Sequence, residues 1–139
     1  DAMCAKMLDS DFNQGIEVVV LPNLYGDIVT DVAAEHAGGL GNACSSNIGS
    51  KYALFEAIHG TAPYLMSHGR GAYANPCSLI RAIGQMLIHI GYAQKNELLE
   101  KALEICTVTE KKCIVTTFAE DASAAEFTDY LIETIQKLR

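Results

Sequence analysis

The strongest constraint on the fold is a short apolar run, GIEVVVLPN, at residues 15–23. The run is rich in β-branched side chains and is stopped by Pro22. A continuous run of this kind is typical of a strand that is buried on both faces. Such a strand needs neighbouring strands, and helices that cover both faces of the sheet. We therefore expect an α/β architecture.

Hydrophobic spacing and turn residues predict the other elements. A helical period begins at the first turn, through Met3, Met7 and Leu8, so we expect the chain to be part of a longer protein. We expect a helix from Asp27 to about residue 37, with Asp27 as its N-cap, followed by a glycine and serine loop at 38–50 and a strand or strand-like segment at 51–60. A loop at 64–76 leads to a helix from Pro76 to about Tyr92 and an amphipathic helix at 95–107. A short strand at 113–117 and a closing helix at 123–138 complete the expected elements. The loop at 38–50 is the expected domain junction.

The charge balance excludes some classes of partner. The chain has 139 residues, half of them apolar, with 17 acidic and 10 basic residues and a net charge of −7. An acidic surface disfavours general binding to nucleic acid or to an anionic membrane. A local pocket for an anion is still compatible with this balance.

The cysteines and the hydropathy pattern bear on the compartment. The five cysteines are scattered, with no CxxC pair and no zinc-type spacing. We expect reduced thiols in a cytoplasmic protein or, in a eukaryote, a mitochondrial matrix protein. The sequence has no apolar run of about 18 to 20 residues, so we expect no membrane span.

The first candidate for chemistry is a pair of aspartates in PNLYGDIVTD. Asp27 and Asp31 stand four positions apart and would share one helix face, at a cost of a few tenths of a kcal/mol in repulsion. A divalent cation would reverse that repulsion, and two carboxylates with substrate oxygens suit Mg²⁺ or Mn²⁺. From the spacing alone, the favoured alternative is simpler: Asp27 caps the helix and Asp31 is solvated.

The second candidate is the loop EAIHGTAP, followed by YANP. Small residues at 60–62 let a ligand approach the backbone closely, and His59 could stack on a nucleotide or form a hydrogen bond to it. The loop is neither a P-loop nor a GxGxxG motif. Taken alone, His59 is more simply a satisfied loop histidine, and Asn75 before Pro76 an ordinary helix cap.

In this order, the motifs resemble those of the β-decarboxylating dehydrogenases, the isocitrate and isopropylmalate dehydrogenase family. The segments that carry the resemblance are NLYGDIVTD, GGLGNACSSNIG, FEAIHGTAP, ANP and MLIHIG, and the similarity runs over essentially all 139 residues. It implies the C-terminal part of that family's α/β fold, a mixed sheet flanked by helices that differs from the Rossmann fold. Residues 1–37 would end the small dimerisation domain, and 38–139 would form the returning half of the large cofactor-binding domain.

The resemblance implies roles for the acidic residues. Asp27 and Asp31 match two aspartates that bind the Mg²⁺ or Mn²⁺ ion chelated by the substrate's hydroxyl and adjacent carboxylate. Asp1 matches a further aspartate that reaches the neighbouring protomer's metal site and serves it in metal binding or proton transfer. The resemblance thus makes Asp1 and Asp27 the expected catalytic residues, and it implies a homodimer or higher oligomer with shared active sites.

The family resemblance also implies a binding loop for the cofactor. Asn75 matches a residue that forms a hydrogen bond to adenine, and Glu56 lies just upstream of the loop, near the cofactor. Gly41 and the SNIG stretch resemble the segment beside the nicotinamide. The residues that match the adenosine loop itself are His59, Gly60, Thr61, Ala62 and Pro63.

The reaction implied is an oxidation followed by a decarboxylation. Hydride leaves the carbinol carbon of a 2-hydroxy acid for the nicotinamide, and the 2-keto acid then loses the carboxylate β to its new carbonyl. The metal acts as a Lewis acid on the hydroxyl and on the enolate left by carbon dioxide. The family's tyrosine and lysine for proton transfer, and the serine and arginines that grip the substrate, match no residue of this chain.

The residues after the HGTAP loop bear on the choice between NAD and NADP. In NADP-type bacterial members a lysine and a tyrosine follow the HGTAP loop, and a tyrosine and an arginine come later; here Tyr64 and Leu65, then Glu110 and Ile114, take those places. We expect this set to repel or ignore a 2′-phosphate, which favours NAD. Tyr64 nevertheless replaces the aspartate usual in NAD-type members, and His68 and Arg70 could bind a phosphate.

The motif sequences are most similar to those of NAD-type isocitrate dehydrogenases, which act in the tricarboxylic acid cycle. Isopropylmalate, homoisocitrate and tartrate are alternative substrates. A non-catalytic regulatory subunit of a hetero-oligomeric isocitrate dehydrogenase is an alternative of another class. The intact Asp27, Asp31 and HGTAP loop argue against that alternative.

Overall fold

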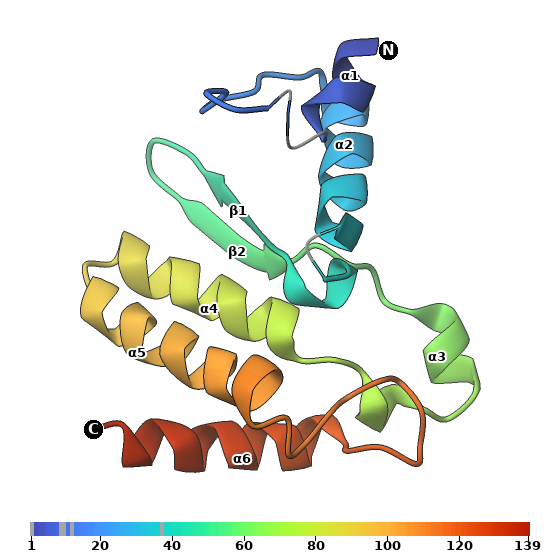
Figure 1. The fold of residues 1–139 in the computed structure, drawn as a ribbon, viewed down its shortest axis with the longest axis vertical. Coiled ribbons are helices and arrows are strands. Elements are labelled where there is room, and N and C mark those ends of the chain that lie inside the picture. The colour runs from blue at the N-terminus through green and yellow to red at the C-terminus, as the bar shows by residue number, and fades with distance from the viewer. Residues whose placement is uncertain (1, 9–10, 12, 37) are drawn as a thin grey trace. The chain divides into compact units, whose positions relative to one another are not determined.

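The computed structural model describes residues 2–8, 11, 13–36 and 38–139 (Figure 1). Helices and a small sheet are combined in one chain, so the predicted α/β architecture is confirmed. The chain divides into two compact units, Asp1–Leu40 and Gly41–Arg139. We describe each unit by itself.

The first unit contains two helices, α1 (Ala2–Met7) and α2 (Asn23–His36). Helix α2 begins directly after Pro22, whose carbonyl accepts the N–H of Gly26 at 2.9 Å. It therefore starts one turn earlier than predicted, because a proline is well tolerated ahead of the first turn. The N–H of Gly39 donates to Ala34 at 2.9 Å, and Gly39 has a φ of 97°, which ends the helix.

The predicted strand at residues 15–23 is wrong. Residues 16–22 have no regular structure, and the side chains of Val18 and Val20 are 79% and 89% exposed. A strand buried on both faces gains its stability from partner strands and covering helices. No strand lies among the described residues of the first unit, so the apolar run has nothing to pair with.

The second unit begins with a hairpin. A short 3₁₀ turn, η1 (Leu40–Asn42), precedes strand β1 (Cys44–Ile48), which pairs with β2 (Ala53–Ala57) in an antiparallel register. The prediction of a strand at 51–60 is confirmed, whereas the prediction of a loop across 38–50 is wrong for β1. Serine and asparagine in β1 indicate a loop by composition, but pairing with β2 overrides that preference.

The remaining helices stack against this hairpin. Helix α4 (Cys77–His89) lies between the hairpin and α5 (Ala93–Glu104), and α6 (Ala124–Lys137) packs against α5 (Figure 1). Residues Ile105–Thr109 continue α5 as a π-helix, η3. All three long helices fall where the sequence predicts them.

Two further predictions are wrong. The predicted loop at 64–76 contains helix α3 (Pro63–Ser67) and a 3₁₀ turn, η2 (Gly71–Tyr73). The predicted strand at 113–117 is irregular. The alternate residues Cys113 and Val115 pack against the core, which accounts for their apolar character. Thr117, at the end of the segment, has a positive φ of 73°, which is not an extended conformation.

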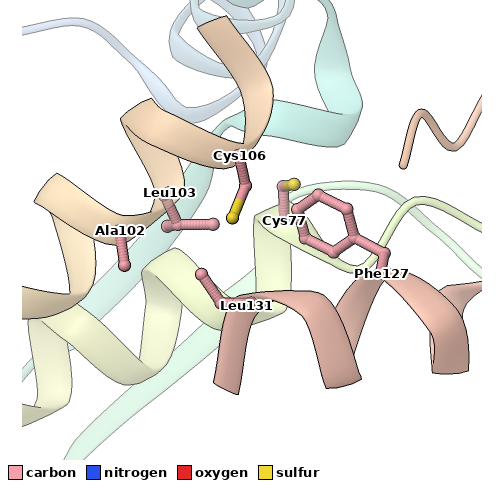
Figure 2. Close-up of a cluster of buried hydrophobic side chains, with 6 residues drawn as sticks. All are labelled: Cys77, Ala102, Leu103, Cys106, Phe127 and Leu131. Atoms are coloured by element: carbon pink, nitrogen blue, oxygen red, sulfur yellow. The ribbon is translucent and has the colours of Figure 1, made fainter. Parts of the chain in front are cut away.

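The core of the second unit lies between α4, α5, η3 and α6. Leu103 and Cys106 are fully buried, and Phe127 of α6 is 2% exposed (Figure 2). The complete buried cluster comprises Cys77, Ala102, Leu103, Cys106, Phe127 and Leu131. This cluster holds the elements from which the pocket described below is built.

Two further properties are seen in the part of the chain that the structure describes. The thiols of Cys44, Cys77, Cys106 and Cys113 are free. Within the described ranges, no helix combines the length and the apolar character needed to cross a membrane.

Candidate functional site

The two predicted metal ligands of α2 lie on one face of that helix. Asp27 and Asp31 are one turn apart, and both are exposed. The Nδ2 of Asn23 donates to Oδ2 of Asp27 at 3.3 Å. Because α2 begins at Asn23, Asp27 lies in its second turn, and the interpretation of Asp27 as the N-cap is wrong. The third predicted ligand, Asp1, lies outside the described residues.

The carboxylate pair fits a hard divalent cation. Mg²⁺ is typically bound through one or two carboxylates and keeps its other positions for water or substrate oxygens. In the part of the chain that the structure describes, no group of three or more His, Cys, Asp or Glu side chains could hold a metal. The pair can supply two carboxylate ligands to such an ion.

A separate pocket lies in the second unit. It has a volume of about 260 Å³, smaller than the roughly 300 to 1,000 Å³ of pockets that hold whole small molecules. It thus suits one part of a larger ligand. Its lining residues are Gly41, His59, Gly60, Ala62, Leu65, Ala74, Asn75 and Thr117.

The loop between β2 and α3 forms one wall of this pocket. Ala62 adopts a left-handed backbone with φ of 46°, and Pro63 then occupies the first turn of α3. A left-handed non-glycine residue costs about 1 kcal/mol or more, and such strain often accompanies functional sites. Nδ1 of His59 lies 3.1 Å from the carbonyl oxygen of Gly60. Because a carbonyl only accepts, a hydrogen bond between the two requires Nδ1 to be the donor, and Nε2 takes no part in it.

Asn75 forms the opposite wall and serves the fold at the same time. Its Oδ1 accepts the backbone N–H of Cys77 at 3.0 Å, which fixes the side chain at the start of α4. A Cβ placed on Gly41 would lie only 3.2 Å from Nδ2 of Asn75, so the glycine makes room for the amide. The N-cap of α4 is Pro76, so Asn75 lies one residue before the cap and binds the first N–H of the helix. Asn75 also lines the pocket, so the two roles are compatible.

The other predicted cofactor residues do not line the pocket. Thr61 lies in the same loop, Pro63 begins α3, and both are exposed. Glu56 lies in β2 opposite Ser45, and its Oε1 accepts a hydrogen bond from Nδ2 of Asn47 at 3.0 Å. The structure thus brings together four residues predicted to bind adenosine, namely His59, Gly60, Ala62 and Asn75, and with them Gly41, which was expected beside the nicotinamide.

One lining residue, Thr117, escaped the sequence analysis. It comes from the segment after η3, whereas Leu65 and Ala74 belong to positions or motifs that the sequence analysis named. No local motif marks Thr117, because its place depends on Cys113 and Val115, which pack against the core. Its positive φ is visible only in the folded chain.

Glu110 is engaged by two neighbours in the second unit. Its Oε2 accepts the hydroxyl of Tyr130 at 2.5 Å and lies 2.6 Å from Nζ of Lys112. The hydrogen bonds from Lys112 and Tyr130 hold the pKa of Glu110 below its ordinary value. Glu110 is not among the residues that line the pocket.

Comparison with known proteins gives consistent matches. A family profile described as Isocitrate/isopropylmalate dehydrogenase matches residues 1–132. The chain is 43% identical over 136 residues to a mitochondrial regulatory subunit of NAD isocitrate dehydrogenase from Dictyostelium discoideum, with 97% of this chain and 37% of that protein covered. It is 49% identical over 86 residues to an NADP isocitrate dehydrogenase from Rickettsia typhi, which covers 62% of this chain and 17% of that protein.

A solved structure is similar over nearly the whole chain. It is the crystal structure of isocitrate dehydrogenase from Methylococcus capsulatus, with a TM-score of 0.79 and 36% identity. The match covers 98% of this chain and 39% of that one. The chain therefore spans less than half the length of the proteins that it matches.

Proposed function

Because the chain belongs to the isocitrate/isopropylmalate dehydrogenase family, we propose that it contributes to the metal-dependent oxidative decarboxylation of a 2-hydroxy acid. The proposed substrate is isocitrate, which yields 2-oxoglutarate and carbon dioxide, and the proposed hydride acceptor is NAD. The observation that carries the proposal is the pocket in which His59, Gly60, Ala62 and Asn75 meet. These residues were named from the sequence as cofactor-binding residues, and they come from two separate loops.

The pocket residues offer suitable contacts for an adenosine group. Nδ2 of Asn75 is a donor, and the ring of His59 has a second nitrogen, Nε2, outside its contact with Gly60. Gly60 leaves its backbone open to a ligand, because a Cβ there would meet nothing within 4 Å. We propose that this pocket holds the adenine end of NAD and that Glu56, Thr61 and Pro63 lie near it.

Asp27 and Asp31 are the proposed ligands of Mg²⁺ or Mn²⁺, with Asp1 serving the site of a neighbouring protomer. When bound, the ion would act as a Lewis acid toward the hydroxy acid. The two carboxylates hold negative charge on one helix face, where neutralisation relieves their repulsion. A homodimer or higher oligomer is part of the proposal, as is the assignment of residues 1–37 and 38–139 to the small and large domains.

The test is turnover by the full-length protein that carries this chain, because the family's proton-transfer and substrate-binding residues match no residue of the chain itself. With isocitrate, NAD and Mn²⁺, we expect NADH to form and its formation to stop when the ion is chelated. Isopropylmalate, homoisocitrate and tartrate are the comparison substrates. A folded oligomer that turns over none of the four would refute the enzymatic proposal.

A regulatory role is the second candidate. The observation in its favour is that the Dictyostelium relative, matched over 97% of this chain, is named a regulatory subunit, and that name also places it in the mitochondrion. A regulatory chain would show no turnover by itself but would change the turnover of a catalytic chain mixed with it. A location in the mitochondrial matrix fits either candidate, and a cytoplasmic location fits a bacterial enzyme.

A further inference from the structure

Arg70 lies between two aromatic rings at the edge of the pocket. Its Cζ is 5.8 Å from the ring centroid of Tyr64 and 5.5 Å from that of Phe118. The ring of His68 packs on Tyr64 with a centroid distance of 4.2 Å. Both distances lie within the roughly 6 Å at which a ring face attracts a cation.

The backbone holds Arg70 in this position. Gly69 has a φ of 67°, a left-handed conformation that glycine adopts readily, and it turns the chain back toward α3. The N–H of Arg70 then donates to the carbonyl of Leu65 at 3.0 Å. The turn at residues 68–70, directly after α3, therefore fixes the backbone position of Arg70.

The guanidinium has no anionic partner in the protein. Among the described residues, no hydrogen bond or ion pair engages the side chain of Arg70, although its two aromatic contacts are present. Lys112 provides the contrast, since it pairs with Glu110 at 2.6 Å. The carboxylate of Asp121, near Phe118 in sequence, accepts the hydroxyl of Thr116. The planar donors of Arg70 are thus available to a ligand.

Both segments that hold Arg70 also line the pocket. Tyr64 lies between Ala62 and Leu65, and Phe118 directly follows Thr117. Tyr64 and Phe118 are themselves 68% and 55% exposed, so both rings are accessible to a ligand that extends beyond the pocket. An arginine fork is suited to bidentate bonds with phosphate oxygens.

We infer that Arg70 binds a phosphate group of the nucleotide whose adenosine end occupies the pocket. The inference rests on the proposed function and adds to it a residue that determines cofactor choice. The phosphate could come from either of two positions, the 2′-phosphate of the ribose or the 5′-linked phosphates. If Arg70 binds the 2′-phosphate, the protein accepts NADP as well as NAD. If it binds the 5′-linked phosphates, it strengthens the binding of both cofactors.

Binding of nucleotide fragments to the full chain distinguishes these sources. The probes are adenosine, ADP and 2′,5′-ADP, titrated calorimetrically into the wild type and into Arg70→Gln. Loss of a charge-assisted pair should weaken binding roughly 10- to 100-fold. A loss confined to 2′,5′-ADP assigns the 2′-phosphate, and an equal loss for ADP and 2′,5′-ADP assigns the 5′ side. Adenosine should bind equally to both proteins.

Two further variants control the experiment. Arg70→Lys keeps the charge but loses the planar fork, so it should recover only part of the affinity. Arg139→Gln removes an arginine at the C-terminal end of the chain, on the opposite side of the second unit from α3 (Figure 1), and should leave all affinities unchanged. If Arg70→Gln does not fold, the lysine variant and the salt dependence of 2′,5′-ADP binding give the same information.

The experiment separates a failure of the inference about Arg70 from a failure of the proposed function. If the wild type binds ADP and reduces NAD but Arg70→Gln binds every probe equally well, the inference about Arg70 is wrong and the proposed function stands. If no adenosine probe binds the wild type, the assignment of the pocket fails, and the role of Arg70 fails with it.

Discussion

The two units of the chain differ in how their candidate sites are supported. In the second unit, α4, α5 and α6 enclose a buried cluster, and the walls of the pocket are attached to those helices or to the hairpin. In the first unit, Ala34 is the one buried side chain among those described, whereas Val18 and Val20 are largely exposed. The pocket therefore has a core of its own, while the aspartate pair stands on a helix with little packing around it. The difference predicts that stability and metal binding respond to different residues.

The largest expected effect is on the core of the second unit. Phe127→Ala removes a side chain that is 2% exposed, and we expect it to lower the free energy of unfolding by about 3 to 5 kcal/mol. Ile132→Ala in the same helix is the control, because that side chain is 46% exposed and should cost much less. Chemical denaturation of the full chain measures both. Equal effects would show that α6 does not seal this core.

The next effect concerns the first unit. Asp27→Asn and Asp31→Asn should each weaken Mn²⁺ binding at least about tenfold, as loss of groups at a metal site does. Neither variant should lower the free energy of unfolding, because both carboxylates are exposed and their repulsion is relieved. Glu17→Gln, an exposed residue of the same unit outside α2, is the charge-matched control. Unchanged Mn²⁺ affinity in both aspartate variants would leave the pair as solvated helix residues.

The same contrast explains which elements the sequence could predict. Helices α4, α5 and α6 carry their own periodic apolar faces, and these faces meet one another within the second unit. Local patterns therefore suffice to predict them. The runs at 15–23 and 113–117 also have strand patterns, but a strand requires a partner that no local pattern supplies. Strand β1 was missed for the converse reason, since its pairing with β2 overrides its composition.

The candidate site follows the same rule. His59, Gly60 and Ala62 share one loop, and Asn75 precedes a helix start, so all four lie within the short motifs that carry the family resemblance, although local chemistry alone favoured simpler interpretations of His59 and Asn75. Thr117 reaches the pocket through the packing of its neighbours against the core, which no motif records. The contacts of Glu110 with Tyr130 and Lys112 likewise appear only in the folded chain.

A smaller effect should come from the start of α6. The hydroxyl of Ser123 accepts the N–H of Glu126, and the carboxylate of Glu126 accepts the N–H of Ser123 at 2.8 Å, which together form a capping box. Ser123→Ala should lower the free energy of unfolding by about 1 kcal/mol. Ser50→Ala, in the exposed turn between β1 and β2, should change it far less. If the two variants behave alike, the packing of α6 and not its cap sets the stability of the second unit.

The smallest effect is a dependence on pH at Glu110. Hydrogen bonds from Lys112 and Tyr130 lower the pKa of Glu110 in the folded chain. A carboxyl whose pKa is lower when folded contributes stability above its unfolded pKa of about 4.3, and this contribution is lost as the pH falls through the folded pKa. Glu110→Gln should therefore be less stable than the wild type near neutral pH, and the difference should shrink in acid.

Unfolding measured from about pH 7 down to about pH 3, across the titration range of carboxyl groups, tests this expectation. Glu133→Gln, an exposed glutamate on α6, is the control and should show no such narrowing. Tyr130→Phe should remove part of the dependence, because its hydroxyl donates one of the bonds that lower the pKa of Glu110. The effect should be small, since surface ion pairs are weakened by solvent and salt. A constant difference across the whole pH range would mean that Glu110 stabilises the second unit by packing and not through its charge.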